Sequence, residues 1–104
     1  MKYTNSNYSN IASARTASEE IVPLPAPSNL TATAINPEPN ATSAKVQLNW
    51  VSNSNGLESG FRIERKTGAE AFTGVATVGK NVVEYIDEGL EFDTEYSYQV
   101  QATV

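Results

Sequence analysis

Short segments in which apolar and polar residues alternate recur along this chain, and residues that favour turns separate them. The clearest is 46–50, Val-Gln-Leu-Asn-Trp, which places Val46, Leu48 and Trp50 on one face. Alternation with a period of two is the pattern of a strand that buries one face, whereas a core helix needs a repeat near 3.6 residues. Strands that recur about every 8–12 residues are typical of an all-β sandwich or barrel, and the sequence predicts that fold class.

The same pattern predicts five further strands. They are expected at 30–35, 61–66, 72–78, 82–86 and 95–104. The residues Asp87-Glu88-Gly89 are expected to form a turn, in which Asp87 caps its own backbone through an Asx-type hydrogen bond. The positions expected to form the core are Leu30, Val46, Leu48, Trp50, Phe61, Ile63, Tyr85, Leu90, Tyr96, Tyr98 and Val100.

Composition removes several classes of function. The 104 residues correspond to about one domain and include no Cys and no His, so thiolate nucleophiles, Cys/His zinc sites and Ser-His-Asp triads are excluded. The net charge of −5 disfavours nucleic acid as a partner. Because no long apolar run occurs, we expect no membrane span, and the polar residues after Met1 predict no signal peptide. No cofactor is expected.

The first 27 residues differ from the rest of the chain. Residues 1–20 are mostly small and polar, and alone they bury too little apolar surface to offset the entropy of ordering. Pro23, Pro25 and Pro27 then alternate with apolar residues, which prevents a helix and favours an extended segment. We interpret this stretch as a linker that leads into an edge strand.

Two motifs identify a family resemblance. The series Leu90-x-Phe92-x-Thr94-x-Tyr96-x-Tyr98-x-Val100 resembles the Leu-x-Pro-x-Thr-x-Tyr-x-x-x-Val pattern of fibronectin type III domains, and Val46-x-Leu48-x-Trp50 resembles their central strand with its core Trp. Three further matches follow in order along residues 24–104. They are Pro25-x-Pro27-x-x-Leu30, Gly60-Phe61-x-Ile63-x-Arg65 and Val83-x-Tyr85-x-Asp87-x-x-Leu90.

The resemblance implies an immunoglobulin-like β-sandwich with seven strands, A to G, in two antiparallel sheets. It implies that Trp50 lies between the sheets and that Tyr96 forms a tyrosine corner, in which a tyrosine hydroxyl hydrogen-bonds to the backbone. Phe92 departs from the pattern, because the family usually has proline there. We expect either a less rigid turn before Tyr96 or packing of Phe92 on the rim of the core.

The order of the matches predicts a chain that is out of phase with the family repeat. Residues 1–18 resemble the F–G loop and G strand of a preceding repeat, residues 19–24 a linker, and residues 25–104 strands A to F. The N-terminal segment is therefore expected to supply strand G, through Tyr8, Ile11, Ala12, Ala14 and Thr16. We expect donation to a neighbouring molecule, with folding back onto the same chain and an undocked tail as the alternatives.

Three groups of side chains are candidates for binding. The carboxylates Glu84, Asp87, Glu88, Glu91, Asp93 and Glu95 are compatible with a calcium site, but a solvated turn and outer strand face is favoured. Lys45, Arg62, Arg65 and Lys66 are compatible with a ligand patch, but ordinary outward strand charges facing Glu64, Glu70 and Glu84 are favoured. Arg65 shares its parity with Phe61 and Ile63, so its aliphatic stem is expected to cover apolar surface at the edge of the core. Tyr3, Tyr8 and Tyr98 are compatible with a sugar-stacking strip, but strand packing is favoured.

These observations predict a module without catalytic activity. The resemblance implies a spacer or structural interaction domain in a multidomain secreted or cell-surface protein, in the style of the bacterial repeats found in polysaccharide-degrading enzymes and surface proteins. Its expected partners are neighbouring domains and, by strand donation, other copies of itself. The alternative is a carbohydrate- or protein-binding module that uses the loops at 52–59 and 3–10.

Overall fold

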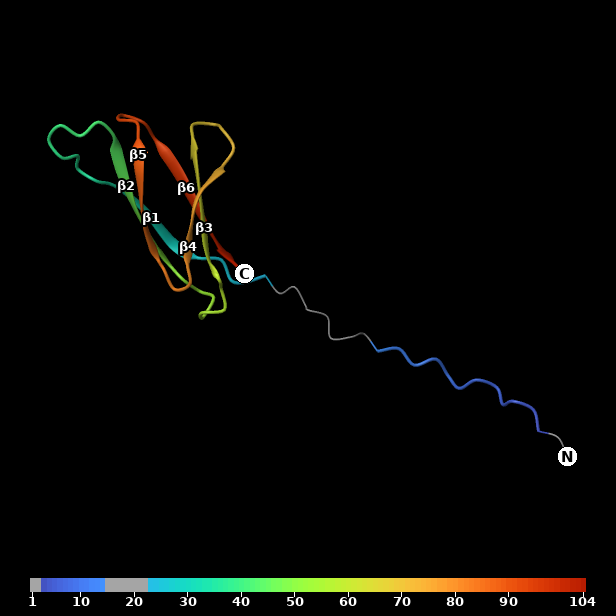
Figure 1. Ribbon diagram of the computed structural model, residues 1–104. Helices are drawn as coiled ribbons and strands as arrows, with labels where there is room; N and C mark the ends of the chain where they lie inside the picture. The colour runs from blue at the N-terminus through green and yellow to red at the C-terminus, as the bar shows by residue number, and fades with distance from the viewer. Residues whose placement is uncertain (1–2, 15–22) are drawn as a thin grey trace.

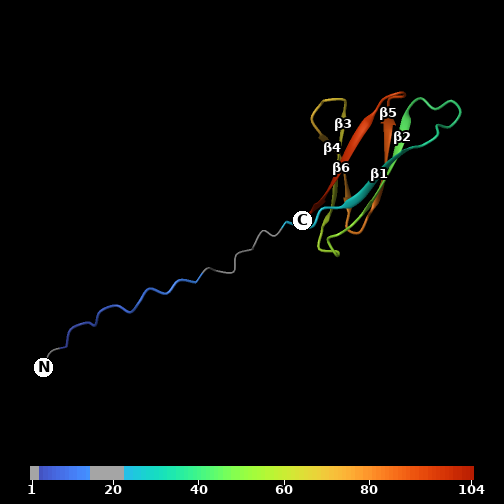
Figure 2. The ribbon, with the colours of Figure 1, turned by 180° about the vertical axis from the view of Figure 1, so that it is seen from behind.

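The prediction of an all-β chain is confirmed. The computed structural model describes residues 3–14 and 23–104, which form six strands and no helix (Figures 1 and 2). The strands are β1 (Ser28–Ala34), β2 (Ala44–Val51), β3 (Gly60–Thr67), β4 (Thr73–Gly79), β5 (Glu84–Leu90) and β6 (Tyr96–Thr103).

The strands form two antiparallel sheets, with orders β1-β2-β5 and β4-β3-β6. Their registers place residues 23–27, 52–59, 80–83 and Val104 at one end, which we call the terminal pole. Residues 35–43, 68–72 and 91–95 lie at the other end, which we call the far pole. β6 therefore ends at the same pole at which β1 begins.

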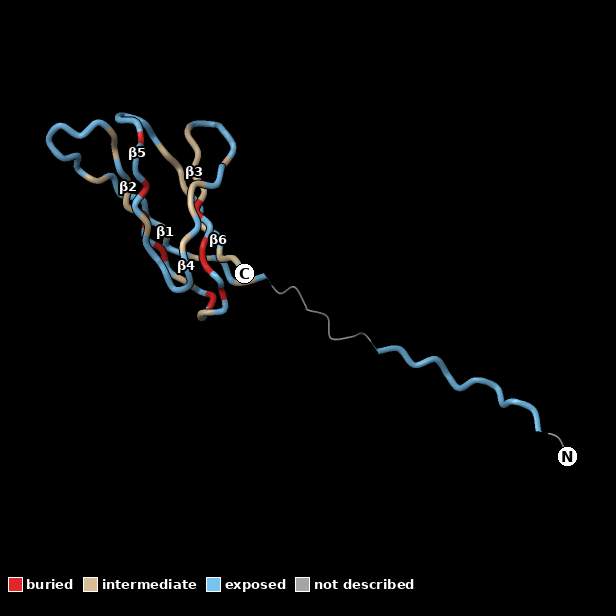
Figure 3. Tube along the Cα trace, in the orientation of Figure 1, coloured by how far each residue is buried: buried red, intermediate tan, exposed pale blue. Residues whose placement is uncertain are grey.

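The core lies where the two sheets face each other, on the inward faces of β2 and β3 (Figure 3). Leu48 and Trp50 come from one sheet, and Phe61 and Ile63 come from the other. The Trp50 and Phe61 rings meet edge to face, with centroids 5.7 Å apart, in a geometry that aromatic pairs prefer. Since each ring belongs to a different sheet, this contact joins the two layers.

Nine of the eleven positions expected in the core belong to the core cluster or pack against it, and Leu90 and Tyr96 lie outside that cluster. Of the eleven, five are buried and six are half-buried. The buried ones are Leu48, Trp50, Phe61, Ile63 and Leu90, and the half-buried ones are Leu30, Val46, Tyr85, Tyr96, Tyr98 and Val100. The half-buried residues lie around the central four because a sandwich of six short strands encloses only a narrow interior.

The predicted turn at 87–89 is wrong, because these residues belong to β5. The register between β2 and β5 shifts between Ala44 and Val46, so that β5 carries one extra residue there. Gly89 lies within this bulge with φ +72°, a conformation that favours glycine. Without the extra residue, Asp87 and Leu90 would face opposite sides of the sheet; with it, both are buried. Asp87 therefore faces the interior and does not cap its own turn.

Gly60 permits a close approach at the start of β3. A Cβ atom at this position would lie 2.1 Å from the carbonyl oxygen of Val78 on β4. The backbones of β3 and β4 could not keep this register with any larger residue, so a glycine is required where the strand leaves the 52–59 loop.

The position of Phe61 predicts a large effect of truncation. We expect Phe61→Ala to lower the free energy of unfolding by about 3–5 kcal/mol, because the substitution leaves a cavity beneath Trp50. Phe92→Ala is the matched control, since Phe92 is 45% exposed at the far pole, and it should cost much less. Urea unfolding followed by tryptophan fluorescence measures both. Equal losses would contradict this account of the core, and Ile63→Val provides a milder core variant if Phe61→Ala does not fold.

Candidate functional site

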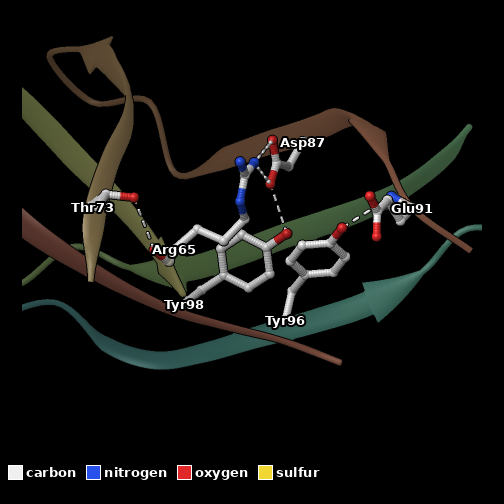
Figure 4. Close-up of polar contacts among 6 residues, drawn as sticks. All are labelled: Arg65, Thr73, Asp87, Glu91, Tyr96 and Tyr98. Carbon is white, nitrogen blue, oxygen red and sulfur yellow. Dashed lines mark hydrogen bonds and ion pairs between the residues drawn. The ribbon is translucent and has the colours of Figure 1, made fainter. Parts of the chain in front are cut away.

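Asp87 is a buried carboxylate on β5 that accepts hydrogen bonds from side chains on β3 and β6, two adjacent strands of the opposite sheet (Figure 4). Arg65 Nη1 on β3 donates to Asp87 Oδ1 at 3.0 Å and to Oδ2 at 2.8 Å. The Tyr98 hydroxyl on β6 donates to Oδ2 at 2.7 Å. Because Asp87 is on β5, this cluster connects the two layers of the sandwich through charge-assisted hydrogen bonds.

The cluster changes the proton affinity of its members. Burial, followed by the hydrogen bond to Asp87, raises the pKa of Tyr98 well above its ordinary value. The hydrogen bond to Asp87 raises the pKa of Arg65 as well. Both shifts favour the protonated donor, so the cluster holds one carboxylate between a guanidinium and a neutral phenol.

Arg65 lies on the inward side of β3, as its parity with Phe61 and Ile63 predicts. The prediction did not include its partner: the guanidinium reaches Asp87 on the opposite sheet. Two others behave as outward strand charges: Arg62 Nε pairs with Glu64 Oε2 at 3.2 Å, and Lys45 Nζ approaches Glu88 Oε1 at 3.8 Å. The hydrogen bonds of Gln99 and Arg62 lower the pKa of the half-buried Glu64.

Tyr96 lies beside this cluster and has a different role. Its hydroxyl accepts a hydrogen bond from the backbone N–H of Glu91 at 2.9 Å (Figure 4). Its ring lies under the guanidinium of Arg65, 5.6 Å from the ring centroid, within the range of a cation–π contact. Tyr96 thus fastens the turn at 91–95 to the start of β6.

The 52–59 loop at the terminal pole contains a second buried polar group. Glu58 and Ser54 are almost fully buried, and the Ser52 hydroxyl donates to Glu58 Oε1 at 3.3 Å. Among the described residues, Glu58 Oε2 and the Trp50 indole N–H are buried without a hydrogen-bond partner. This polar group belongs to the loop itself, in which Asn55 and Gly56 form the turn and the side chain of Leu57 directly after them is exposed.

The same loop holds the segment that precedes β1. Asn53 Nδ2 donates to the carbonyl oxygen of Ala26 at 2.9 Å and lies 3.0 Å from the Ser28 hydroxyl. These contacts cross from the loop after β2 to the proline-rich stretch at 23–27. They fix the direction in which the chain reaches the sandwich.

The other candidate groups are not assembled into sites. Of the six clustered carboxylates, Asp87 is buried and bound to Arg65, while the other five are exposed. Within residues 3–14 and 23–104, no three potential metal-binding side chains come together. Tyr3 and Tyr8 are exposed, whereas Tyr98 is turned inward to Asp87, so the three do not form a strip.

The expected donor segment is exposed where the structure describes it. Tyr8, Ile11, Ala12 and Ala14 are all exposed. Thr16 lies outside the described residues, as does most of the expected linker at 19–24. The described part of the segment is therefore available for contact with another strand.

Comparison of the chain with protein families and with curated proteins finds no match. In the described part of the chain, no helix is long and apolar enough to cross a membrane.

The Asp87 cluster predicts a specific loss of stability. We expect Asp87→Asn to lower the free energy of unfolding by about 2–3 kcal/mol, because it removes the charge that Arg65 and Tyr98 share. Glu88→Gln on the same strand is the matched control, and should change the free energy by less than about 0.5 kcal/mol because its ion pair is exposed. Urea unfolding measures both, and equal effects would contradict a structural role for Asp87.

The raised pKa of Tyr98 predicts a loss of stability in alkali. The unfolded chain ionises Tyr98 near pH 10, whereas the folded chain keeps it protonated. The stabilisation is therefore fully present below about pH 10 and is lost progressively as the pH rises above it.

Tyr98→Phe should unfold more easily at neutral pH by about 1 kcal/mol, and its stability should fall less steeply above pH 10. Urea unfolding at a series of pH values compares the two slopes. The same slope in both proteins would show that Tyr98 is not the group responsible.

Proposed function

We propose that this chain is a non-catalytic module of the fibronectin type III type that acts as a spacer or structural interaction domain in a multidomain secreted or cell-surface protein. Three features support the type. Trp50 lies between two antiparallel sheets, the Tyr96 hydroxyl binds the backbone at Glu91, and β4 pairs with β3. The last feature differs from the constant-type immunoglobulin order, in which the fourth strand joins the sheet of the first, second and fifth strands.

The observation that carries the spacer proposal is the anchored proline segment at 23–27. A spacer must transmit a direction from one domain to the next, so its connection has to be stiff. Alternate prolines restrict the backbone of this segment, and Asn53 holds it by the carbonyl oxygen of Ala26. The charged cluster at Asp87 supports the same proposal, because its polar atoms hold the two sheets together.

The course of β6 adds support for an axial arrangement. β6 ends at the terminal pole, where residues 23–27 also lie. A strand added antiparallel to β6 would run from this pole to the far pole. The polypeptide that supplies this strand would then enter at one pole and leave at the other, as a spacer in a row of domains requires.

A binding module that uses its loops is the second candidate. Leu57 favours it, because this side chain is 72% exposed in the 52–59 loop. The buried Ser54 and Glu58 in the same loop hold it in place, and a fixed loop with an exposed apolar side chain can contact a carbohydrate or a protein.

The stiffness of the connection can be measured directly. Spin labels on cysteines introduced by Leu24→Cys and Glu88→Cys should give a narrow distribution of distances. Adding Asn53→Ala should broaden that distribution, because it frees the proline segment, whereas adding Asn49→Ala on the outer face of β2 should not. A distribution that Asn53→Ala leaves unchanged would contradict the spacer proposal.

Electrophoresis through gels that contain soluble cellulose, chitin or xylan derivatives separates the two candidates. A spacer should migrate at the same rate in every gel. Retardation that Leu57→Ala abolishes would favour the binding module instead, and release of reducing sugar from these polymers would contradict a non-catalytic role.

A further inference from the structure

The two open sides of the sandwich differ in chemistry. On the side of β4 and β5, a hollow of about 500 Å³ is lined by Arg65, Asp87 and Glu88, and the ion pair joins the sheets there. On the side of β1 and β6, a hollow of about 400 Å³ is lined mainly by apolar residues. They are Pro23, Leu24, Ala26, Pro27, Val100, Ala102 and Val104, with Gln101 beside them. This second side therefore leaves apolar surface uncovered.

The backbone of β6 is also unpaired on that side. β6 pairs with β3, and no other described strand lies against its outer edge. Alternate N–H and C=O groups of an edge strand point outward and can bind a further strand. Natural edges are often protected by charges or proline, but residues 96–104 contain neither. The edge of β6 is thus both unpaired and unprotected.

The described N-terminal segment has the properties of a strand that could fill this edge. Residues 3–14 contain no charge, no proline and no glycine, and all of them are exposed. Ile11 is 92% exposed and Tyr8 fully so, which is unfavourable for apolar side chains in water. Alternation places Tyr8, Asn10, Ala12 and Ala14 on one face of an extended strand and Ile11 on the other. The two alanines are small enough to pack beside the half-buried Val100 and Ala102.

We propose that residues 8–14 of one copy of this chain pair antiparallel with the outer edge of β6 of a second copy, so that the copies join head to tail. The pairing would satisfy the free backbone groups of β6 and cover the apolar hollow beside β1. Each copy offers one donor segment and one acceptor edge, which are different surfaces. The contact is therefore heterologous, and it can extend into a chain or close into a ring.

A second copy is favoured over the same copy by the path that the chain would have to take. An antiparallel donor strand runs from the terminal pole to the far pole, so residue 14 would lie near the far pole. In the same copy, the chain would have to return along the sandwich to Pro23 at the terminal pole. The connecting sequence contains Arg15, Glu19 and Glu20, and charged side chains are disfavoured along an apolar hollow. In a second copy the chain simply continues beyond the far pole.

Light scattering of the full chain over about a hundredfold range of concentration tests the proposal. The average mass should at least double as the concentration rises. The double variant Ile11→Pro/Ala12→Pro should stay monomeric. Consecutive N–H groups of a strand point to opposite edges, so two adjacent prolines remove one hydrogen bond from the ladder whichever edge pairs with β6. The matched control Asn5→Pro/Ser6→Pro has the same substitution outside the pairing segment and should assemble like the original chain.

Addition of the donor as a separate peptide tests the acceptor edge. A labelled peptide of residues 3–18 should bind the Ile11→Pro/Ala12→Pro variant, and its fluorescence anisotropy should rise. The same peptide with both prolines should not bind. Hydrogen exchange should show slower exchange of the β6 amides when the peptide is bound.

Three results would overturn the proposal. A chain that is monomeric at every concentration excludes donation, and slow exchange of residues 8–14 in that monomer would identify folding back instead. Assembly that persists in Ile11→Pro/Ala12→Pro would show that another surface is responsible. A peptide that does not bind would show that the β6 edge does not accept this segment.

Discussion

The carboxylate of Asp87 is the polar contact on which the closed form of this sandwich depends. Two sheets of three short strands enclose few fully buried side chains, so the apolar core alone gives them a limited contact area. Asp87 on β5 binds Arg65 on β3 and Tyr98 on β6. A buried charge is tolerated only when it is paired and hydrogen-bonded, so this cluster fixes which strands face each other. The apolar contact of Trp50 with Phe61 holds the layers together, and the Asp87 cluster fixes their alignment.

Alternation along the chain was sufficient to predict the strands. Val46, Leu48 and Trp50 repeat with a period of two and lie on the inner face of β2, and Phe61 and Ile63 do the same on β3. These predictions succeeded because one face of each strand is buried against the other sheet. Side chains of a strand point alternately to its two faces, so every second residue is apolar. The ends of the strands were less accurate, since pairing with a neighbour extends a strand into residues with no apolar alternation of their own.

The region around Asp87 could not be predicted by the same reasoning. Asp, Glu and Gly in sequence are typical of a turn, and the extra residue at the bulge interrupts the alternation between Asp87 and Leu90. One signal was present: Asp87 has the same parity as Tyr85, and Arg65 has the same parity as Ile63. An acidic residue and a basic residue that both lie at inward-facing positions of their strands indicate a buried ion pair. Which strands face each other depends on the tertiary arrangement, so the sequence alone did not identify the partners.

The two open sides of the sandwich relate the proposed spacer to the proposed assembly. On the β4 and β5 side, the charged groups of Arg65 and Asp87 already pair with each other, so another strand would add little stabilisation there. The β1 and β6 side has unpaired backbone and apolar surface, so a further strand is stabilised there by both. Because β6 ends at the pole where residues 23–27 lie, any antiparallel strand at this edge leads toward the far pole. Because the added strand ends at the far pole, the domain connected to it lies beyond that pole, and successive domains form a row. This holds whether the added strand comes from the same polypeptide or from another copy.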